Sequence, residues 1–205
     1  MSRPALVRYL SHPQVVVDPN VPITEWALSD VGTARIDALS AVAKQALAGT
    51  TSVFTSPERK ARDAAAPLAR ALGCPVQIAE DSYENDRSAT GYLPPETFET
   101  TADSFFAQPK ISIHGWEKAE NAQERIVQSV TKITKIAPTG DILIVGHGAV
   151  GTLLYCAFSG QPISREFDQG SGGGGNYFSF YRQSLKPLSM WLEIETLIPE
   201  NSAIV

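Results

Sequence analysis

Apolar and polar positions divide the chain into alternating stretches typical of strands and helices. Short apolar runs at residues 5–11, 51–56, 75–79 and 141–148 have the length and composition of buried strands. Most of the segments between them carry apolar residues at three- and four-residue steps, which predict amphipathic helices. This alternation favours an α/β fold, a three-layer sandwich in which a mostly parallel central sheet has helices on both faces.

The first two helices have predicted ends. Ser29 can cap a helix as its N-cap residue, and Asp30 suits the electropositive first turn. The apolar stripe of this helix consists of Ile36, Leu39, Ala43, Ala46 and Leu47. Gly49 is placed to end it. A second helix is expected to start at Ser56-Pro57, because proline is favoured at the first helical position.

Later segments break the alternation. Residues 80–115 combine acidic residues, asparagine, proline, phenylalanine and glycine without clear periodicity, which predicts an irregular cap insertion. A long amphipathic helix is expected from Trp116 to Ile133. The final apolar segments, NYFSFYR and MWLEIETL, predict a C-terminal hairpin. We therefore expect a single domain over residues 1–205, with a cap at about 80–115.

Polar residues lie at the ends of three of the predicted strands. They are Ser11 and His12, Ser56, and His147 and Gly148. Ligands of open parallel sheets bind at the carboxyl ends of the strands, so these residues are expected to share one site. Pro13 stops the first strand at His12, and the helix that opens at Gly148 has free N–H groups that favour an anion.

Each candidate also has an ordinary structural interpretation. His12 could be a surface loop residue, and a basic residue near a helix start, such as Lys60, is commonly a solvated charge. Glu84 and Arg87 lie in a polar loop, where a carboxylate could protonate a leaving oxygen and an arginine could add positive charge. His114 is expected to be a loop residue without a function.

Composition narrows the class of partner. The formal net charge is −5 without a run of basic residues, which disfavours nucleic acid. No apolar run approaches the roughly 20 residues of a membrane span, and the N-terminus lacks a signal-peptide pattern, so we expect a cytoplasmic protein. Cys74 and Cys156 have no metal-like spacing and are expected to be reduced, packed thiols.

A glycine-rich segment, GSGGGG at residues 170–175, formally matches a dinucleotide-binding motif. That motif requires a preceding strand and a following helix. Here no strand precedes the glycines and a strand follows them, so we expect a flexible loop. Whether this loop lies beside the site stays open.

The ordered motifs resemble those of the histidine phosphatase superfamily, in its phosphoglycerate-mutase-like branch. YLSHPQV resembles the segment that carries the nucleophilic histidine, and ILIVGHGAVGTLL closely resembles the segment of the second catalytic histidine. The matching segments between them are WALSDVGTARIDAL, VFTSPERKARDAA and YENDRSATGYL. The resemblance covers most of the chain. It implies that His12 forms a phosphohistidine, that His147 stabilises the phosphoryl group, and that Glu84 protonates the leaving alcohol and then activates water, without metal or other cofactor.

The chain departs from the family pattern at two phosphate-binding positions. Ser11 replaces the arginine before the nucleophile, so Ser-His-Pro stands for Arg-His-Gly, and Lys60 replaces a second arginine. The expected phosphate-binding residues are Ser11, Lys60, Arg87 and Gly148. Arg8 lies about 13 Å back along the strand and is not expected to reach the site. If Arg8-Tyr9 aligned with the Arg-His pair of the family, the nucleophilic histidine would be lost. The proline break at Pro13 favours the other alignment, in which Ser11-His12 takes the place of this pair.

Three functions follow from these residues. Hydrolysis of a small phosphate monoester through His12 is favoured. The alternative is a catalytically impaired phosphoester- or protein-binding protein, which the changes at Ser11 and Lys60 motivate. A phosphomutase is less favoured, because glycolytic mutases of the family typically have longer caps. The expected partner is a small phosphorylated substrate, whose identity stays open. The oligomeric state also stays open, and a homodimer is one of the alternatives.

Overall fold

The computed structural model describes residues 3–170 and 172–199 as one mixed six-stranded sheet with helices on both faces. The strands are β1 (Leu6–Ser11), β2 (Thr50–Thr55), β3 (Val76–Ile78), β4 (Asp141–Gly146), β5 (Asn176–Tyr181) and β6 (Leu192–Glu193). Their order across the sheet is β3-β2-β4-β1-β5-β6. β3, β2, β4 and β1 run parallel, whereas β5 and β6 pair antiparallel, which confirms the predicted sheet and its C-terminal hairpin strand.

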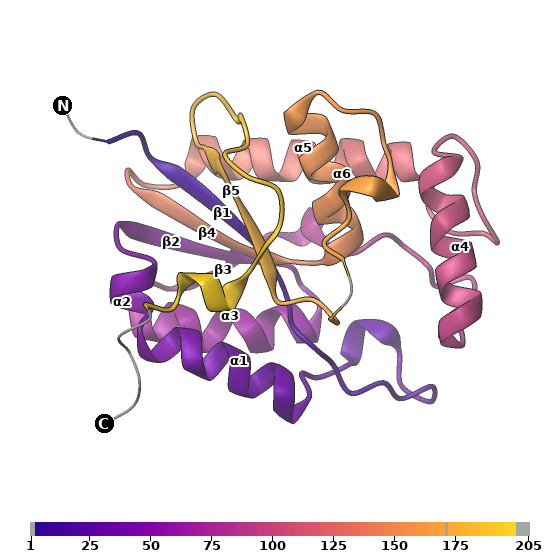
Figure 1. The fold of residues 1–205 in the computed structure, drawn as a ribbon, viewed down its shortest axis with the longest axis horizontal. Helices are drawn as coiled ribbons and strands as arrows, with labels where there is room; N and C mark the ends of the chain where they lie inside the picture. Colours follow the sequence, from indigo (N-terminus) through magenta and orange to yellow (C-terminus); the bar gives the residue numbers. More distant parts are fainter. Residues whose placement is uncertain (1–2, 171, 200–205) are drawn as a thin grey trace.

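Two helix layers enclose this sheet (Figure 1). α1 (Asp30–Ala41), α2 (Ala43–Ala46) and α3 (Arg59–Leu72) cover one face, and α5 (Ala119–Ile136) and α6 (Gly148–Ser159) cover the other. α4 (Pro95–Ala107) lies at the end of the molecule where the parallel strands terminate. Within residues 3–170 and 172–199, no helix has both the length and the apolar content that crossing a membrane requires.

The strands contribute alternate residues to two buried cores. Ile142 and Ile144 of β4 pack with α5 and α6, and Leu143 and Val145 pack with α1 and α3. This period of two follows from the strand pleat. Both faces of β4 are therefore buried, as its uninterrupted apolar sequence predicts.

The helix starts agree only in part with the predictions. The Ser29 side chain accepts a hydrogen bond from the Gly32 N–H, so the predicted N-cap of α1 is confirmed. The apolar stripe is divided between α1 and α2, and Gly49 follows both with a φ of 89°. The prediction that Pro57 begins α3 was wrong, because Glu58 is the N-cap and the first helical residue is Arg59.

The cap is less irregular than expected. Residues 95–107 form α4, which begins with Pro95 and buries Phe105 and Phe106 against the core. The Glu, Thr and Ser residues between the apolar positions obscure this helical period. The predicted start of the next helix was also early: α5 begins at Ala119, and Trp116 is buried in the preceding loop, where its Nε1 donates to Thr90.

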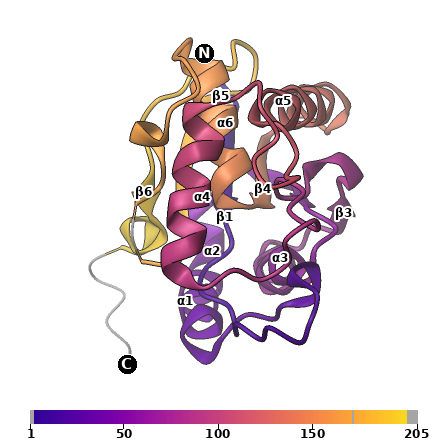
Figure 2. The same cartoon turned by 90° about the vertical axis from the view of Figure 1, so that its right-hand side faces the viewer.

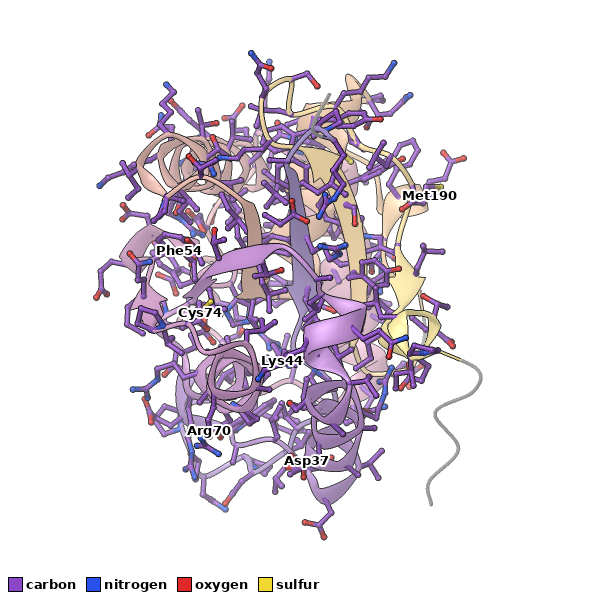
Figure 3. All side chains as sticks on the ribbon, turned by 90° about the vertical axis from the view of Figure 1, so that its left-hand side faces the viewer. Asp37, Lys44, Phe54, Arg70, Cys74 and Met190 are labelled. Carbon is purple, nitrogen blue, oxygen red and sulfur yellow. The ribbon has the colours of Figure 1, made fainter. Side chains whose placement is uncertain are left out.

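The two ends of the sheet differ in chemistry. Figure 2 faces the end where β1, β2 and β4 terminate, with α4 in front. Figure 3 faces the opposite end, where Asp37 of α1 and Arg70 of α3 are exposed. At the amino end of β4, Asp141 accepts hydrogen bonds from Arg3 and Arg8. Arg8 therefore lies away from the carboxyl ends of the strands.

Candidate active site

The ends of β1, β2 and β4 are hydrogen-bonded to one another, which brings the predicted strand-end residues together. β4 lies between the other two strands. The His12 N–H donates to Gly146 O at 2.9 Å, and the Ser56 N–H donates to Val145 O at 3.0 Å. His147 follows β4 directly as the N-cap of α6. One sheet edge therefore carries His12, Ser56 and His147.

The His12 imidazole is oriented by its own backbone neighbourhood. Its Nδ1 lies 2.8 Å from Pro13 O, which can accept a hydrogen bond but cannot donate one. Nδ1 therefore carries the proton of the neutral ring, and Nε2 keeps its lone pair. Burial, together with His147 and the positive charge of Lys60, lowers the pKa of His12 to about 3. The ring is thus neutral and nucleophilic at physiological pH.

His147 lies edge-on to His12 and is completely buried. The two ring centroids are 5.2 Å apart at an interplanar angle of 76°. Ser56 Oγ accepts from the Glu58 N–H and lies 2.7 Å from His147 Nε2, where the hydroxyl can either donate to this nitrogen or accept from it. Nδ1 has no hydrogen-bond partner among the described residues. Burial, followed by the charges of Lys60, Arg87 and Arg125, holds the pKa of His147 well below its ordinary value.

Tyr9 fixes the backbone of His147 from the neighbouring strand. Its hydroxyl accepts from the His147 N–H at 3.1 Å and donates to His147 O at 3.2 Å. A Cβ at position 146 would lie 2.4 Å from this hydroxyl, so the close approach requires Gly146. The glycine therefore serves the alignment of the histidine.

Glu84 reaches the same place from the cap region. Its carboxylate accepts from the Ala149 N–H at 3.2 Å and the Val150 N–H at 2.9 Å, in the first turn of α6. Burial raises the pKa of Glu84, an effect that the Val150 N–H opposes. On the cap side, Arg125 of α5 donates to the carbonyl oxygens of Tyr83 and Glu84, which holds the carboxylate in position.

Arg87 brings a positive charge that none of the described carboxylates neutralises by direct contact. Its guanidinium carbon lies 4.9 Å from the ring centroid of Phe98, on α4. Within residues 3–170 and 172–199, its guanidinium forms no salt bridge and donates no hydrogen bond. Burial lowers the pKa of Arg87, and Glu84 opposes this effect. A desolvated cation without an ionic partner favours binding of an anion.

A pocket of about 930 Å³ adjoins this sheet edge. His12, Glu84, Arg87 and Gly148 line its inner part, Phe98, Ala102 and Phe106 of α4 form an apolar wall, and Gly170, Gly172, Gly173 and Gly174 follow one rim. The glycine loop thus lies beside the site and leads into β5, not into a helix. A Cβ at position 174 would lie 2.2 Å from His12 O, so only glycine fits there.

Two predicted phosphate-binding residues lie outside this pocket. Lys60 is buried, and its Nζ donates to Glu58 Oε2 at 2.5 Å and to Ile23 O at 2.8 Å. Glu58 Oε1 lies 3.6 Å from His147 Nε2 and accepts from the Glu84 N–H. The ammonium group is thus neutralised by a carboxylate, although Lys60 is close enough to lower the pKa of both histidines.

Ser11 is also covered. Its hydroxyl accepts from the Asn176 N–H and lies 2.5 Å from the Oε1 of Gln169, a residue that lines the pocket. Ser11 is completely buried and does not line the pocket itself. Any influence of Ser11 on a bound ligand therefore acts through Gln169.

A sequence profile of the histidine phosphatase superfamily (branch 1) matches residues 21–173. The chain belongs to this superfamily. The matched range begins after His12, so membership rests on the remaining motifs and the assignment of His12 rests on its geometry. No curated protein sequence gives a significant match.

Solved structures of the superfamily share the fold at low sequence identity. A mycobacterial glucosyl-3-phosphoglycerate phosphatase in complex with inorganic phosphate superimposes with a TM-score of 0.75 at 17% identity, covering 93% of this chain and 99% of that one. Bacillus stearothermophilus YhfR gives a TM-score of 0.70 at 18% identity, with coverages of 85% and 90%. An Escherichia coli protein described as a putative α-ribazole-5′-phosphate phosphatase gives 0.68 at 14%, with 93% and 97%.

The structure brings His12, His147 and Glu84 together at one sheet edge, whereas Ser11 and Lys60 lie outside the pocket. Sequence reasoning missed Glu58, Gln169 and Arg125, because each takes part through contacts between segments far apart in the chain. The three-residue segment Pro57-Glu58-Arg59 gives no sign that Glu58 is buried beside a histidine. Among the described residues, no three His, Cys, Asp or Glu side chains are grouped in a way that could hold a metal ion.

Proposed function

We propose that this member of the histidine phosphatase superfamily hydrolyses a small phosphate monoester through a phosphohistidine on His12. The observation that carries the proposal is the pair of imidazoles with ring centroids 5.2 Å apart, in which the His12 Nδ1 faces Pro13 O and its Nε2 is free. A phosphoryl group in the adjoining pocket would meet this nitrogen as nucleophile. Its oxygens would meet the Arg87 guanidinium and the Gly148 N–H at the start of α6.

The chemistry divides into two displacements at phosphorus. In the first, the His12 Nε2–P bond forms while the bond from phosphorus to the ester oxygen breaks, and protonated Glu84 gives its proton to the leaving alcohol. In the second, a water oxygen attacks phosphorus, Glu84 accepts the water proton, and the N–P bond breaks to release inorganic phosphate. The raised pKa of Glu84 supports its role as the acid of the first step, and Arg87 and an N–H of His147 would offset charge on the equatorial oxygens.

A second candidate function is binding of a phosphoester or protein without turnover. The buried Glu58 favours it, because its carboxylate lies 3.6 Å from His147 and adds negative charge beside a phosphate site. His147 is also fully buried and does not line the pocket in which His12 lies. Turnover therefore requires the phosphoryl group to gain access to His147, whereas simple binding in the pocket does not.

One experiment separates the two candidates. Wild type, His12→Asn and His114→Asn are incubated with p-nitrophenyl phosphate, and each protein is tested for an acid-labile, base-stable phosphoryl label. The chain has three histidines, and His114 lies exposed in a loop with a φ of 50°, which asparagine tolerates. His114→Asn is therefore a matched control.

The proposal expects turnover and label in wild type and in His114→Asn, and neither in His12→Asn. Turnover that persists in His12→Asn would reject His12 as the nucleophile. Saturable binding of phosphate without turnover or label, over a panel of sugar, alkyl and aryl phosphates, would instead support the binding function.

A further inference from the structure

Gln169 has a side-chain amide whose two ends lie in different surroundings. Oε1 lies 2.5 Å from Ser11 Oγ and 3.4 Å from Asn176 Nδ2. The Ser11 hydroxyl already accepts from the Asn176 backbone N–H, and its single proton is best placed on the shorter contact, toward Gln169. This hydrogen bond identifies the amide oxygen and therefore the direction of the amide nitrogen.

The nitrogen lies against the first turn of α6. A Cβ at position 148 would lie only 2.2 Å from Gln169 Nε2, so Gly148 is the residue that leaves room for the amide. Gln169 and Gly148 both line the pocket that contains His12. Nε2 has no hydrogen-bond acceptor among the residues that the structure describes, so its two protons remain available to a ligand.

We infer that Gln169 is a phosphate-binding residue that donates from Nε2 to a phosphoryl oxygen, in place of the arginine that Ser11 replaces. Ser11 is its positioning residue, because the serine hydroxyl holds the amide oxygen and thereby turns Nε2 toward the helix N-terminus. An amide donor contributes no charge, so the positive charge of the pocket comes from its arginines: Arg87, and Arg165, which is paired with Glu99 and Asp103. The inference rests on the proposed function for its ligand, but it concerns binding and can be tested without turnover.

The test measures the dissociation constant of inorganic phosphate by calorimetry, beside the kinetics of p-nitrophenyl phosphate. Gln169→Glu keeps the oxygen that faces Ser11 but replaces the donor by an anionic acceptor, whereas Gln169→Met removes the amide at similar length. Ser11→Ala tests positioning. Gln45→Glu, at an exposed site on α2, controls for the change of charge.

Loss of a hydrogen bond to a charged group corresponds to about a tenfold to hundredfold weaker binding. We expect this loss in Gln169→Met, a larger one in Gln169→Glu, a smaller one in Ser11→Ala, and none in Gln45→Glu. KM of the aryl phosphate and the inhibition constant of phosphate should rise together. Unfolding transitions identify folded variants, and Gln169→Met supplies the answer if Gln169→Glu does not fold.

The outcomes distinguish this inference from the proposed function. If Gln169→Met and every folded Gln169 variant bind phosphate as wild type does, or if wild type binds no phosphate, the inference is rejected. If wild type binds phosphate, loses that binding in Gln169→Met, and yet hydrolyses no phosphoester, the inference holds and the proposed hydrolysis is rejected.

Discussion

Replacing Arg87 by methionine should separate activity from stability. Each hydrogen bond from its guanidinium to a phosphoryl oxygen is worth about 1.5–3 kcal/mol, so kcat/KM for p-nitrophenyl phosphate should fall about 10- to 150-fold per bond lost. The free protein loses a cation–π contact of about 0.5–1 kcal/mol with Phe98, 4.9 Å away. It regains a similar amount, because methionine packs on aromatic rings and the desolvated charge disappears.

The unfolding free energy should therefore stay within about 1 kcal/mol of wild type. Steady-state kinetics and urea denaturation give the two quantities, and added phosphate should raise the Tm of wild type but not of Arg87→Met. Arg70→Met, at an exposed position on α3, is the matched control. A kcat/KM that stays within threefold of wild type, roughly 0.7 kcal/mol, would refute the assignment of Arg87 to phosphate.

Three further changes test other parts of the site. Since burial raises the pKa of Glu84, kcat should fall as the pH rises through that raised pKa. Glu84→Gln should remove this alkaline limb of the pH profile and slow hydrolysis of an alkyl phosphate by roughly 10²–10⁴-fold. Lys60→Met should lower the unfolding free energy in urea by about 3–5 kcal/mol, because it leaves the buried Glu58 carboxylate unpaired, and adding Glu58→Gln should recover most of the loss. The pKa of His147 in the folded protein lies well below its ordinary value of 6.5. As the pH falls below 6.5, the unfolded chain therefore gains a proton that the folded chain does not, and the unfolding free energy falls by up to about 1.4 kcal/mol per pH unit. His147→Asn should reduce this slope.

Each of these results has a clear contrary outcome. An unchanged alkaline limb in Glu84→Gln would assign the proton to another group. A double variant no more stable than Lys60→Met would show that the charge of Glu58 is not the cause of the loss. The same acid slope in His147→Asn as in wild type would place the linked proton elsewhere.

The sequence predicted those parts of the fold and site that depend on local patterns. Apolar runs that end in polar residues located β1 and β4, and Ser29 located the start of α1 because an N-cap acts within three residues. The family motifs then identified His12 and His147 as neighbours, although 135 residues separate them. Such features need no knowledge of how distant segments pack.

The features that were missed depend on contacts across the fold. Residues 95–107 have the apolar spacing of a helix, but polar residues occupy its exposed side and the pattern is weak until Phe105 and Phe106 pack on the core. Lys60 was expected at the phosphate because its position allows it. The buried carboxylate of Glu58, which the chain places two residues earlier, takes the ammonium group instead. Local sequence does not determine which of two nearby partners a charge selects.

Ser11, Gln169 and Gly148 depend on one another for space. Ser11 is completely buried with Gln169 2.5 Å from its hydroxyl, so an arginine at position 11 would need the volume that Gln169 occupies. The Gln169 amide in turn occupies space that a Cβ at position 148 would enter. Lys60 is neutralised by Glu58. Within the cap, residues 80–115, Arg87 is the basic residue that lines the pocket. Arg87 is held by Phe98 of α4 and not by the sheet. Phosphate affinity should therefore depend on how the cap packs. It would depend less on the cap if the charge came from an arginine on β1.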